Sequence, residues 1–341
     1  MSTKRKVAVL VAGSWGTALA TVLADNQFDV ALWTRNEAQA DEINTHHTNS
    51  RYLNDAVLPD GITATTEMKD AVTGAELVLF AAPSVAMRDV AKQAQPYLEP
   101  EAICVHATKG FESVTYKRMT TVLSEELQIP LDRLVVLSGP SHAEEVVRRL
   151  PTTVVVASAS IETAEKAQDA FITRHFRVYT NKDVIGVEVA GAIKNIIALG
   201  AGLTDGLGFG DNAKAALLTR GLAEISRLGT AMGASPLTFA GLAGVGDLVV
   251  TCTSKHSRNW RAGSMLAEGL TLDEVLSKMG MVVEGVRTTS TARELANHYG
   301  VEMPITEQLF AVLFQNKTPR SAVESLMGRG RTHETEDVAG A

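Results

Sequence analysis

The sequence predicts an α/β protein with a Rossmann-like, doubly wound and mostly parallel sheet, followed by an all-helical C-terminal domain. In the first half, short apolar runs alternate with helical patterns, which is typical of a parallel sheet covered by helices on both faces. From about Ile185 the strand pattern fades and long helical patterns take over. The 341 residues are enough for two domains. We therefore expect a dinucleotide-binding domain at residues 1–183, a helical substrate and catalytic domain at 184–330, and a polar tail at 331–341.

The hydrophobic periodicity places the individual elements. Short apolar runs predict strands at residues 6–10, 30–33, 76–81, 103–106, 134–137 and 153–156. Between them, apolar residues at helical spacing predict helices at 16–24, 84–95 and 116–126. In the second half, helices are expected at 185–203, 213–227 and 271–279, with glycine-rich turns at 202–210 and 241–246.

The composition narrows the class of function. Lys and Arg number 32 against 39 Asp and Glu, which gives a net charge of −7 at pH 7. An acidic balance argues against nucleic acid or an anionic membrane as the main partner. The two cysteines, Cys104 and Cys252, are too few for a disulfide framework, so a reduced, cytoplasmic protein is the simpler interpretation.

Two apolar segments resemble export or membrane signals. The N-terminus has a basic start and an apolar stretch, as a secretory signal peptide has, but Gly13 and Gly16 interrupt it. The longest later stretch, 185–203, carries Glu188 and Lys194. It is therefore expected to be a buried helix, and we predict no integral membrane segment.

The first expected strand runs into Val11-Ala12-Gly13-Ser14-Trp15-Gly16 and then into a helix. This is the setting of the dinucleotide fingerprint G-x-G-x-x-G, with its second and third glycines present. Gly13 would let the backbone approach a pyrophosphate at the helix N-terminus, and Gly16 would allow close packing of helix on strand. Val11 stands where the motif has its first glycine. The alternative is a plain strand–helix turn whose small residues serve packing.

The end of the second expected strand bears on the choice of cofactor. An acidic residue at this place would bind the ribose 2′-hydroxyl of NAD, but Arg35 stands there instead, nineteen residues after Gly16. A guanidinium suits the 2′-phosphate of NADP. The alternative is a solvated arginine in a loop.

Two further strand ends carry polar residues. Lys109 follows the strand at 103–106, and the segment 138–143, Ser-Gly-Pro-Ser-His-Ala, follows the strand at 134–137. Ligands of open α/β sheets bind at the carboxyl ends of the strands. If the sheet is doubly wound, both segments face the same crevice, although each alone has ordinary loop composition.

Lys194 lies in a helical pattern that is apolar on almost every face. Burial would lower the pKa of its ammonium group toward neutrality, as a proton-transferring lysine requires. The alternative, which the pattern supports equally, is a lysine that reaches the surface along its apolar stem.

A third polar cluster follows Gly246-Asp247 and consists of Ser257-Arg258-Asn259. Hydroxyl, guanidinium and amide donors side by side suit a phosphate, although a charge run is more often a solvated face. Glu284 precedes another helix and could lie near a ribose. No histidine or cysteine spacing indicates a metal site.

Together these segments resemble the bacterial type of NAD(P)-dependent glycerol-3-phosphate dehydrogenase. The resemblance spans nearly the whole chain, through VAGSWGTALA, ATKGFE, LSGPSHAEEV, GAIKNIIALGAGLTDGLGFGDNAKAAL, GVGDLVVTCTSKHSRN, VVEGVRT and MPITE. It implies an oxidoreductase that interconverts sn-glycerol 3-phosphate and dihydroxyacetone phosphate for phospholipid synthesis. It also implies a homodimer and the use of NAD(P). Arg35 makes NADP the preferred cofactor, with NAD possible, and no metal is expected.

The resemblance assigns a role to each matching residue. Lys194 would be the catalytic residue that transfers the proton at C2. Substrate contacts would come from Lys109, Gly139, Ser141, Lys194, Asp247, Ser257, Arg258 and Asn259. Cofactor contacts would come from Gly13, Ser14, Trp15, Gly16, Arg35, Tyr52, Lys109, Ala143, Arg258, Val282 and Glu284. The family has glycine at the place of Val11, so this departure bears on cofactor affinity more than on reaction type.

Two other functions fit the pattern less well. Another β-hydroxyacid-type dehydrogenase with a helical second domain would share the architecture, but the Ser257-Arg258-Asn259 cluster favours a phosphorylated substrate. A catalytically idle, NADP-sensing protein would keep the fold, but the presence of both Lys109 and Lys194 argues against it.

Overall fold

The computed structural model describes residues 5–331 and divides the chain into two compact units. The first unit comprises residues 5–108 together with Met119–Val184, and the second comprises Lys109–Arg118 together with 185–331. The ten residues after Thr108 therefore leave the sheet unit and pack with the helices before the chain returns. The expected tail lies, except for Arg331, outside the described residues.

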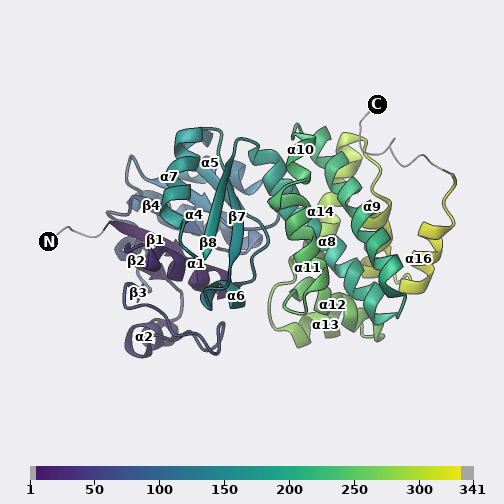
Figure 1. Cartoon of the computed structure of the whole chain (residues 1–341), viewed down its shortest axis with the longest axis horizontal. Coiled ribbons are helices and arrows are strands. Elements are labelled where there is room, and N and C mark those ends of the chain that lie inside the picture. Colours follow the sequence, from purple (N-terminus) through teal and green to yellow (C-terminus); the bar gives the residue numbers. More distant parts are fainter. Residues whose placement is uncertain (1–4, 332–341) are drawn as a thin grey trace. The chain divides into compact units, whose positions relative to one another are not determined.

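The first unit is built on one eight-stranded sheet (Figure 1). Its strands are β1 (Lys6–Leu10), β2 (Asp29–Trp33), β3 (Ile62–Thr65), β4 (Leu77–Phe80), β5 (Ile103–His106), β6 (Leu134–Ser138), β7 (Thr152–Ala157) and β8 (Phe176–Asn181). Their order is β3-β2-β1-β4-β5-β6-β7-β8, and only β7 runs antiparallel to its neighbour β6. The order 3-2-1-4-5-6 is that of the doubly wound dinucleotide-binding fold, so the predicted fold class is confirmed.

Helices cover both faces of this sheet because its strands are apolar on both sides. Val7 and Val9 of β1 belong to one hydrophobic cluster, and Ala8 and Leu10 belong to the other. The covering helices are α1 (Ser14–Asp25), α2 (Glu37–His46), α3 (Met68–Val72), α4 (Met87–Ala94), α5 (Met119–Leu127), α6 (Ala143–Val147) and α7 (Ile161–Phe171). Short 3₁₀ turns lie at Ser84–Ala86, Gln95–Tyr97 and Leu131–Arg133.

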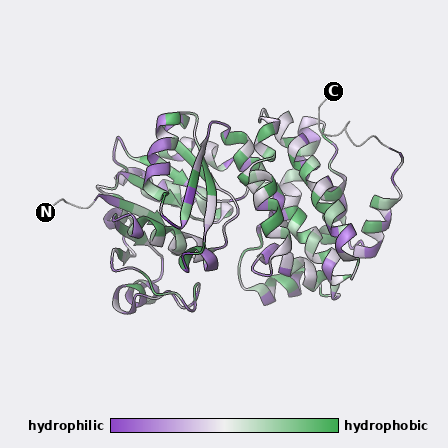
Figure 2. Ribbon diagram, in the orientation of Figure 1, coloured by the Kyte–Doolittle hydropathy of each residue, from purple (hydrophilic) through white to green (hydrophobic). Residues whose placement is uncertain are grey.

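The second unit contains helices around one buried helix, α8 (Val184–Gly206). The others are α9 (Gly210–Ala231), α10 (Pro236–Phe239), α11 (Asp247–Thr253), α12 (Arg258–Ala267), α13 (Leu272–Met279), α14 (Glu284–Tyr299), α15 (Pro304–Phe314) and α16 (Pro319–Met327). A π-helical segment, η4 (Leu242–Gly246), precedes α11. Figure 2 shows apolar residues on the helices throughout this unit.

Several expected boundaries were wrong. Gly202 lies inside α8 rather than in a turn. A Cβ at this position would overlap the carbonyl oxygen of Trp260 in α12, so the glycine allows the two helices to touch. Most of the turn expected at 241–246 is π-helical, since the π-helix covers Leu242–Gly246. The helix expected from Tyr116 begins at Met119, since Tyr116 has a positive φ of 60°.

Two helical stretches of the described chain are long and apolar enough, by length and composition, to cross a membrane. The first is α8, whose most apolar window is 89% buried by the rest of the protein, as expected for the core helix of a helical unit. The second spans Pro236–Thr253 and is 44% buried.

Candidate active site

The turn between β1 and α1 has a valine in a backbone conformation that favours glycine. Val11 has a φ of 83°, a left-handed conformation that glycine adopts readily and a β-branched residue rarely does. The backbone N–H groups of Val11 and Ala12 both donate to the carbonyl oxygen of Trp33, at 3.1 Å each. A Cβ on Gly16 would overlap the carbonyl oxygen of Val11, which explains the glycine at that position.

The same turn leaves room for an anion. Gly13 is the N-cap of α1 and makes no side-chain cap hydrogen bond, and a Cβ on Gly13 would meet nothing within 4 Å. Backbone N–H groups at a helix N-terminus favour a phosphate. Trp15 is half-buried against the sheet, and its indole Nε1 has no hydrogen-bond partner among residues 5–331. The residues of the turn therefore fit a pyrophosphate.

The other expected cofactor residues of the first unit lie after β2, in the loop after α2 and at the start of α6. Arg35 follows β2, is exposed, and has its guanidinium 5.8 Å from the centre of the Trp33 ring. Tyr52 is half-buried, and its carbonyl oxygen accepts a hydrogen bond from Ser14 Oγ at 3.1 Å. Ala143, the first residue of α6, is buried.

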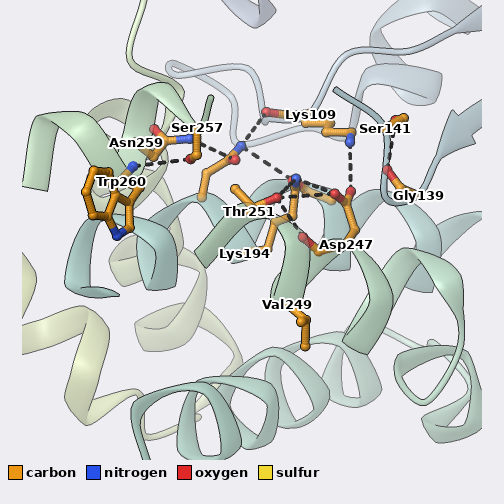
Figure 3. Close-up of polar contacts among 12 residues, drawn as sticks. Lys109, Gly139, Ser141, Lys194, Asp247, Val249, Thr251, Ser257, Asn259 and Trp260 are labelled. Atoms are coloured by element: carbon orange, nitrogen blue, oxygen red, sulfur yellow. Dashed lines mark hydrogen bonds and ion pairs between the residues drawn. The ribbon is translucent and has the colours of Figure 1, made fainter. Parts of the chain in front are cut away.

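Gly139 and Ser141 form a tight turn after β6. Gly139 has a φ of 136°, and a Cβ there would lie 2.9 Å from the Cα of Val154, so only glycine fits. Ser141 Oγ donates to the carbonyl oxygen of Gly139 at 2.9 Å (Figure 3). The structure thus places both residues at the carboxyl end of a strand, where ligands of this fold bind.

In the helical unit, two lysines point at one carboxylate (Figure 3). Lys194 Nζ of α8 lies 2.6 Å from Asp247 Oδ1, and Lys109 Nζ lies 2.7 Å from Asp247 Oδ2. Lys194 Nζ also donates to Thr251 Oγ1 at 2.6 Å. Lys194 is 4% exposed and Asp247 is 1% exposed, so this lysine does not reach the surface along its stem. The structure therefore shows Lys194 as a buried lysine paired with a carboxylate, and not as a surface lysine.

The surroundings of Lys194 bring its pKa close to physiological pH. Burial and the nearby Lys109 ammonium lower the pKa of Lys194 to about 8, although the opposite charge of Asp247 raises it. Burial alone would raise the pKa of Asp247, but Lys109 and Lys194 outweigh it and leave that pKa lowered. Asp247 is therefore ionised, while Lys194 can gain and lose a proton near physiological pH.

The predicted phosphate cluster forms the start of α12, and its members have different surroundings. Ser257 is the N-cap, and its Oγ accepts from the backbone N–H of Trp260 at 3.2 Å. Asn259 is buried and bridges Asn195 and the backbone N–H of Gly285, at 2.9 Å each. Arg258 is exposed. The cluster therefore offers one solvent-facing cation beside two side chains engaged within the helical unit.

Val282 and Glu284 lie at the beginning of α14, both half-buried. The bond from Gly285 to Asn259 ties this helix end to α12 and so fixes the backbone next to Glu284.

Two residues that contact Lys194 or Lys109 were not predicted from the sequence. Thr251 stands four positions after Asp247, the helical spacing that puts both side chains on one face, and this signal could have found it. Asn195 follows Lys194 directly, and its Nδ2 donates to the carbonyl oxygen of Lys109 at 3.3 Å. Only the folded path of the Lys109–Arg118 segment reveals that contact.

Among residues 5–331, no group of three or more His, Cys, Asp or Glu side chains is arranged to hold a metal ion. The positive charge beside Asp247 comes from the ammonium groups of Lys109 and Lys194.

A doubly wound sheet whose first turn fits a pyrophosphate, joined to a helical unit that buries a lysine, is the arrangement of a dinucleotide-dependent oxidoreductase. Comparison with known families narrows this class. The N-terminal part of NAD-dependent glycerol-3-phosphate dehydrogenase matches residues 6–164, and the C-terminal part matches residues 183–324. The chain therefore belongs to the NAD-dependent glycerol-3-phosphate dehydrogenase family.

Individual relatives agree with this assignment. Proteins named glycerol-3-phosphate dehydrogenase [NAD(P)+] from Bacillus licheniformis and Geobacillus thermodenitrificans are 57% and 58% identical, and each match covers at least 97% of both chains. The crystal structure of glycerol-3-phosphate dehydrogenase from Coxiella burnetii is similar, with a TM-score of 0.90 and 39% identity over 96% of this chain and 99% of that one. A ketopantoate reductase from Ralstonia eutropha, at 18% identity and a TM-score of 0.58, shares the fold alone.

Proposed function

We propose that the chain catalyses reversible hydride transfer between NAD(P)H and dihydroxyacetone phosphate, giving sn-glycerol 3-phosphate. The observation that carries the proposal is the buried Lys194, whose pKa near 8 and contact with Asp247 suit a proton donor, in a chain of this family. The relatives named glycerol-3-phosphate dehydrogenase [NAD(P)+] support the same substrate.

The reaction needs one hydride and one proton, and the protein supplies the proton. The hydride for C2 of the ketone is what a nicotinamide cofactor would supply when bound. Lys194 Nζ donates the proton to the C2 oxygen as negative charge develops there, and until that transfer its positive charge stabilises the oxygen. In the reverse direction neutral Lys194 takes the proton from the C2 hydroxyl.

Asp247 and Lys109 set the conditions for this transfer. The Asp247 carboxylate keeps Lys194 protonated in spite of burial and orients its Nζ through the 2.6 Å hydrogen bond. Lys109 shares the carboxylate and adds a second positive charge near a dianionic substrate. Net acidity of the whole chain is compatible with this, because the local charge of the cluster is positive.

Substrate binding is proposed for the remaining polar residues. Arg258 supplies the exposed guanidinium for the phosphate, while Ser257 and Asn259 hold the start of α12 in place. Gly139 and Ser141 contribute polar backbone and hydroxyl groups after β6. Binding energy from the phosphate then orients the reacting carbonyl.

Cofactor binding is proposed for the β1–α1 turn, Gly13–Gly16, with Tyr52, Lys109, Ala143, Arg258, Val282 and Glu284 as further contacts. The exposed Arg35 at the end of β2 favours NADP, because a guanidinium can pair with the 2′-phosphate. Arg35→Ser should therefore raise the Kd for NADPH about tenfold or more and leave the Kd for NADH within about twofold. Equal losses for both cofactors would contradict the preference.

The substrate is tested directly by the oxidation of NADPH and NADH in parallel, followed at 340 nm. Dihydroxyacetone phosphate should be reduced, whereas ketopantoate and other unphosphorylated 2-keto acids should not. Reduction of a keto acid alone would favour another dehydrogenase of this architecture. Cofactor binding without turnover of any of these ketones would favour the sensing protein.

The cellular setting remains a set of predictions. We expect the product to serve phospholipid synthesis, the protein to lie in the cytoplasm, and two copies to form a homodimer, which light scattering on the purified protein would test.

A further inference from the structure

A buried asparagine outside the expected site residues contacts the β1–α1 turn. Asn49 lies in the loop after α2 and is 0% exposed. Its Nδ2 donates to the carbonyl oxygen of Ala12 at 3.0 Å and to Thr17 Oγ1 of α1 at 2.8 Å. Its Oδ1 accepts from Gln39 Nε2 at 3.0 Å. Every polar atom of this side chain is therefore used to join α1 and α2 to the turn.

Gln39 of α2 reaches the same carbonyl. Its Nε2 lies 2.7 Å from the oxygen of Ala12, and its Oε1 accepts from Thr34 Oγ1 at 2.5 Å. The carbonyl of Ala12 thus accepts two amide hydrogen bonds, while the N–H of Ala12 donates to Trp33 on the other side. The peptide groups on both sides of Ala12 are held in one orientation.

That orientation determines where the next N–H points. The peptide bond between Ala12 and Gly13 is planar and trans, so the Gly13 N–H points away from the direction of the Ala12 carbonyl. The carbonyl faces the buried amides, and the Cβ position of Gly13 is open. The N–H is therefore directed away from the two amides, at the helix end that fits a pyrophosphate.

We propose that Asn49, assisted by Gln39, is a positioning residue that aims the Gly13 N–H at the dinucleotide pyrophosphate. The inference rests on the proposed cofactor. Its importance is increased by Val11, whose φ of 83° costs free energy that a glycine would not incur. Without the two amides holding Ala12, the turn can relax toward an ordinary valine conformation and rotate the Gly13 N–H away.

The test measures fragment binding to the apoprotein, so that turnover is not needed. Calorimetric titration compares 2′-phospho-ADP-ribose, which contains the pyrophosphate, with 2′-AMP, which does not. Asn49→Ala should raise the Kd of 2′-phospho-ADP-ribose about tenfold and change that of 2′-AMP less than twofold. Gln39→Met should act in the same direction with a smaller effect, and because Gln39 is only half-buried this variant remains informative if Asn49→Ala does not fold.

Asn44 provides the matched control. It also lies on α2 and forms two amide hydrogen bonds, but to the backbone of Ala64 in β3. Asn44→Ala should leave both fragment affinities within twofold of the parent. In a Val11→Gly background the loss caused by Asn49→Ala should shrink, because glycine adopts the positive φ without assistance.

The outcomes separate this inference from the proposed function. If the parent binds 2′-phospho-ADP-ribose and folded Asn49→Ala and Gln39→Met bind it equally well, the positioning role is overturned while the dehydrogenase proposal stands. Equal losses for both fragments overturn it too, since they indicate general damage to the unit. If the parent itself binds neither fragment, the NADP assignment fails first, and the positioning role fails with it.

Discussion

Replacing Asp247 by asparagine should move the pH dependence of the reaction to lower pH. Burial lowers the pKa of Lys194, and the charge of Asp247 is the main influence that raises it. The substitution Asp247→Asn would keep the shape of the side chain but remove that charge, leaving Lys194 buried beside the ammonium of Lys109. The variant should therefore lose its protonated lysine at lower pH than the parent does.

The magnitude follows from the contact distance. Lys194 Nζ lies 2.6 Å from the carboxylate, and an opposite charge this close shifts a pKa by about 1–3 units. The pKa of Lys194 in the parent is about 8, so in Asp247→Asn it should fall to about 5–7. Each unit corresponds to about 1.4 kcal/mol of lost interaction with the charged form.

The assay is kcat/KM for reduction of dihydroxyacetone phosphate between pH 5 and 10. Reduction needs the protonated lysine, so the rate of the parent should fall as pH rises through about 8, whereas oxidation of glycerol 3-phosphate should rise through the same pH. Thr251→Val removes the 2.6 Å hydrogen bond from Lys194 Nζ to Thr251 Oγ1 without removing a charge. It should shift the pH at which the rate falls by less than about one unit. If the rate of Asp247→Asn falls at the same pH as that of the parent, Asp247 does not raise the pKa of Lys194.

Three further changes test separate parts of the account. Arg258→Ala should raise KM for dihydroxyacetone phosphate about tenfold or more with a smaller effect on kcat, and an unchanged KM in steady-state assays would exclude the phosphate contact. An alanine variant is usually more stable than a glycine variant, but at Val11 the order should be reversed. Denaturant melts should find Val11→Gly more stable than Val11→Ala by about 1 kcal/mol, because alanine keeps the strain of the positive φ without the packing of valine. A more stable Val11→Ala would mean that the turn is unstrained. Burial raises the pKa of Glu224 to about 7, so unfolding free energy should fall by up to about 3 kcal/mol as pH rises from 4.5 to 7, and Glu224→Gln should flatten that slope in melts at both pH values.

The buried strands were predictable from the sequence and the edge strands were not. β1 and β5 have the expected bounds because their residues are continuously apolar and buried. β3, four residues long, and β8, with exposed Arg177 and Tyr179, lie at the two edges of the sheet and lack that continuous apolar run. Gly202 was misread for a similar reason, since its role depends on a helix fifty-eight residues further along the chain.

The site was predictable in its residue types but not in its contacts. An apolar helix with one lysine pointed to Lys194, yet equally to a surface lysine, and only the fold shows Asp247 beside it. Asn49 carried no signal because a buried asparagine in a polar loop has no periodic pattern. Its partners, Ala12 and Gln39, belong to other elements and meet it through tertiary folding.

The most direct test of the central claim is the single-turnover rate of NADPH oxidation by Lys194→Met with saturating dihydroxyacetone phosphate. Lys214→Met is the control, since Lys214 forms its ion pair with Asp205 at 2.6 Å, separate from the carboxylate of Asp247. Lys194→Met should be slower than the parent by about 10²–10⁴-fold with unchanged NADPH affinity, while Lys214→Met should stay within about tenfold. A Lys194→Met rate within about tenfold of the parent would contradict the role of Lys194 as the proton donor.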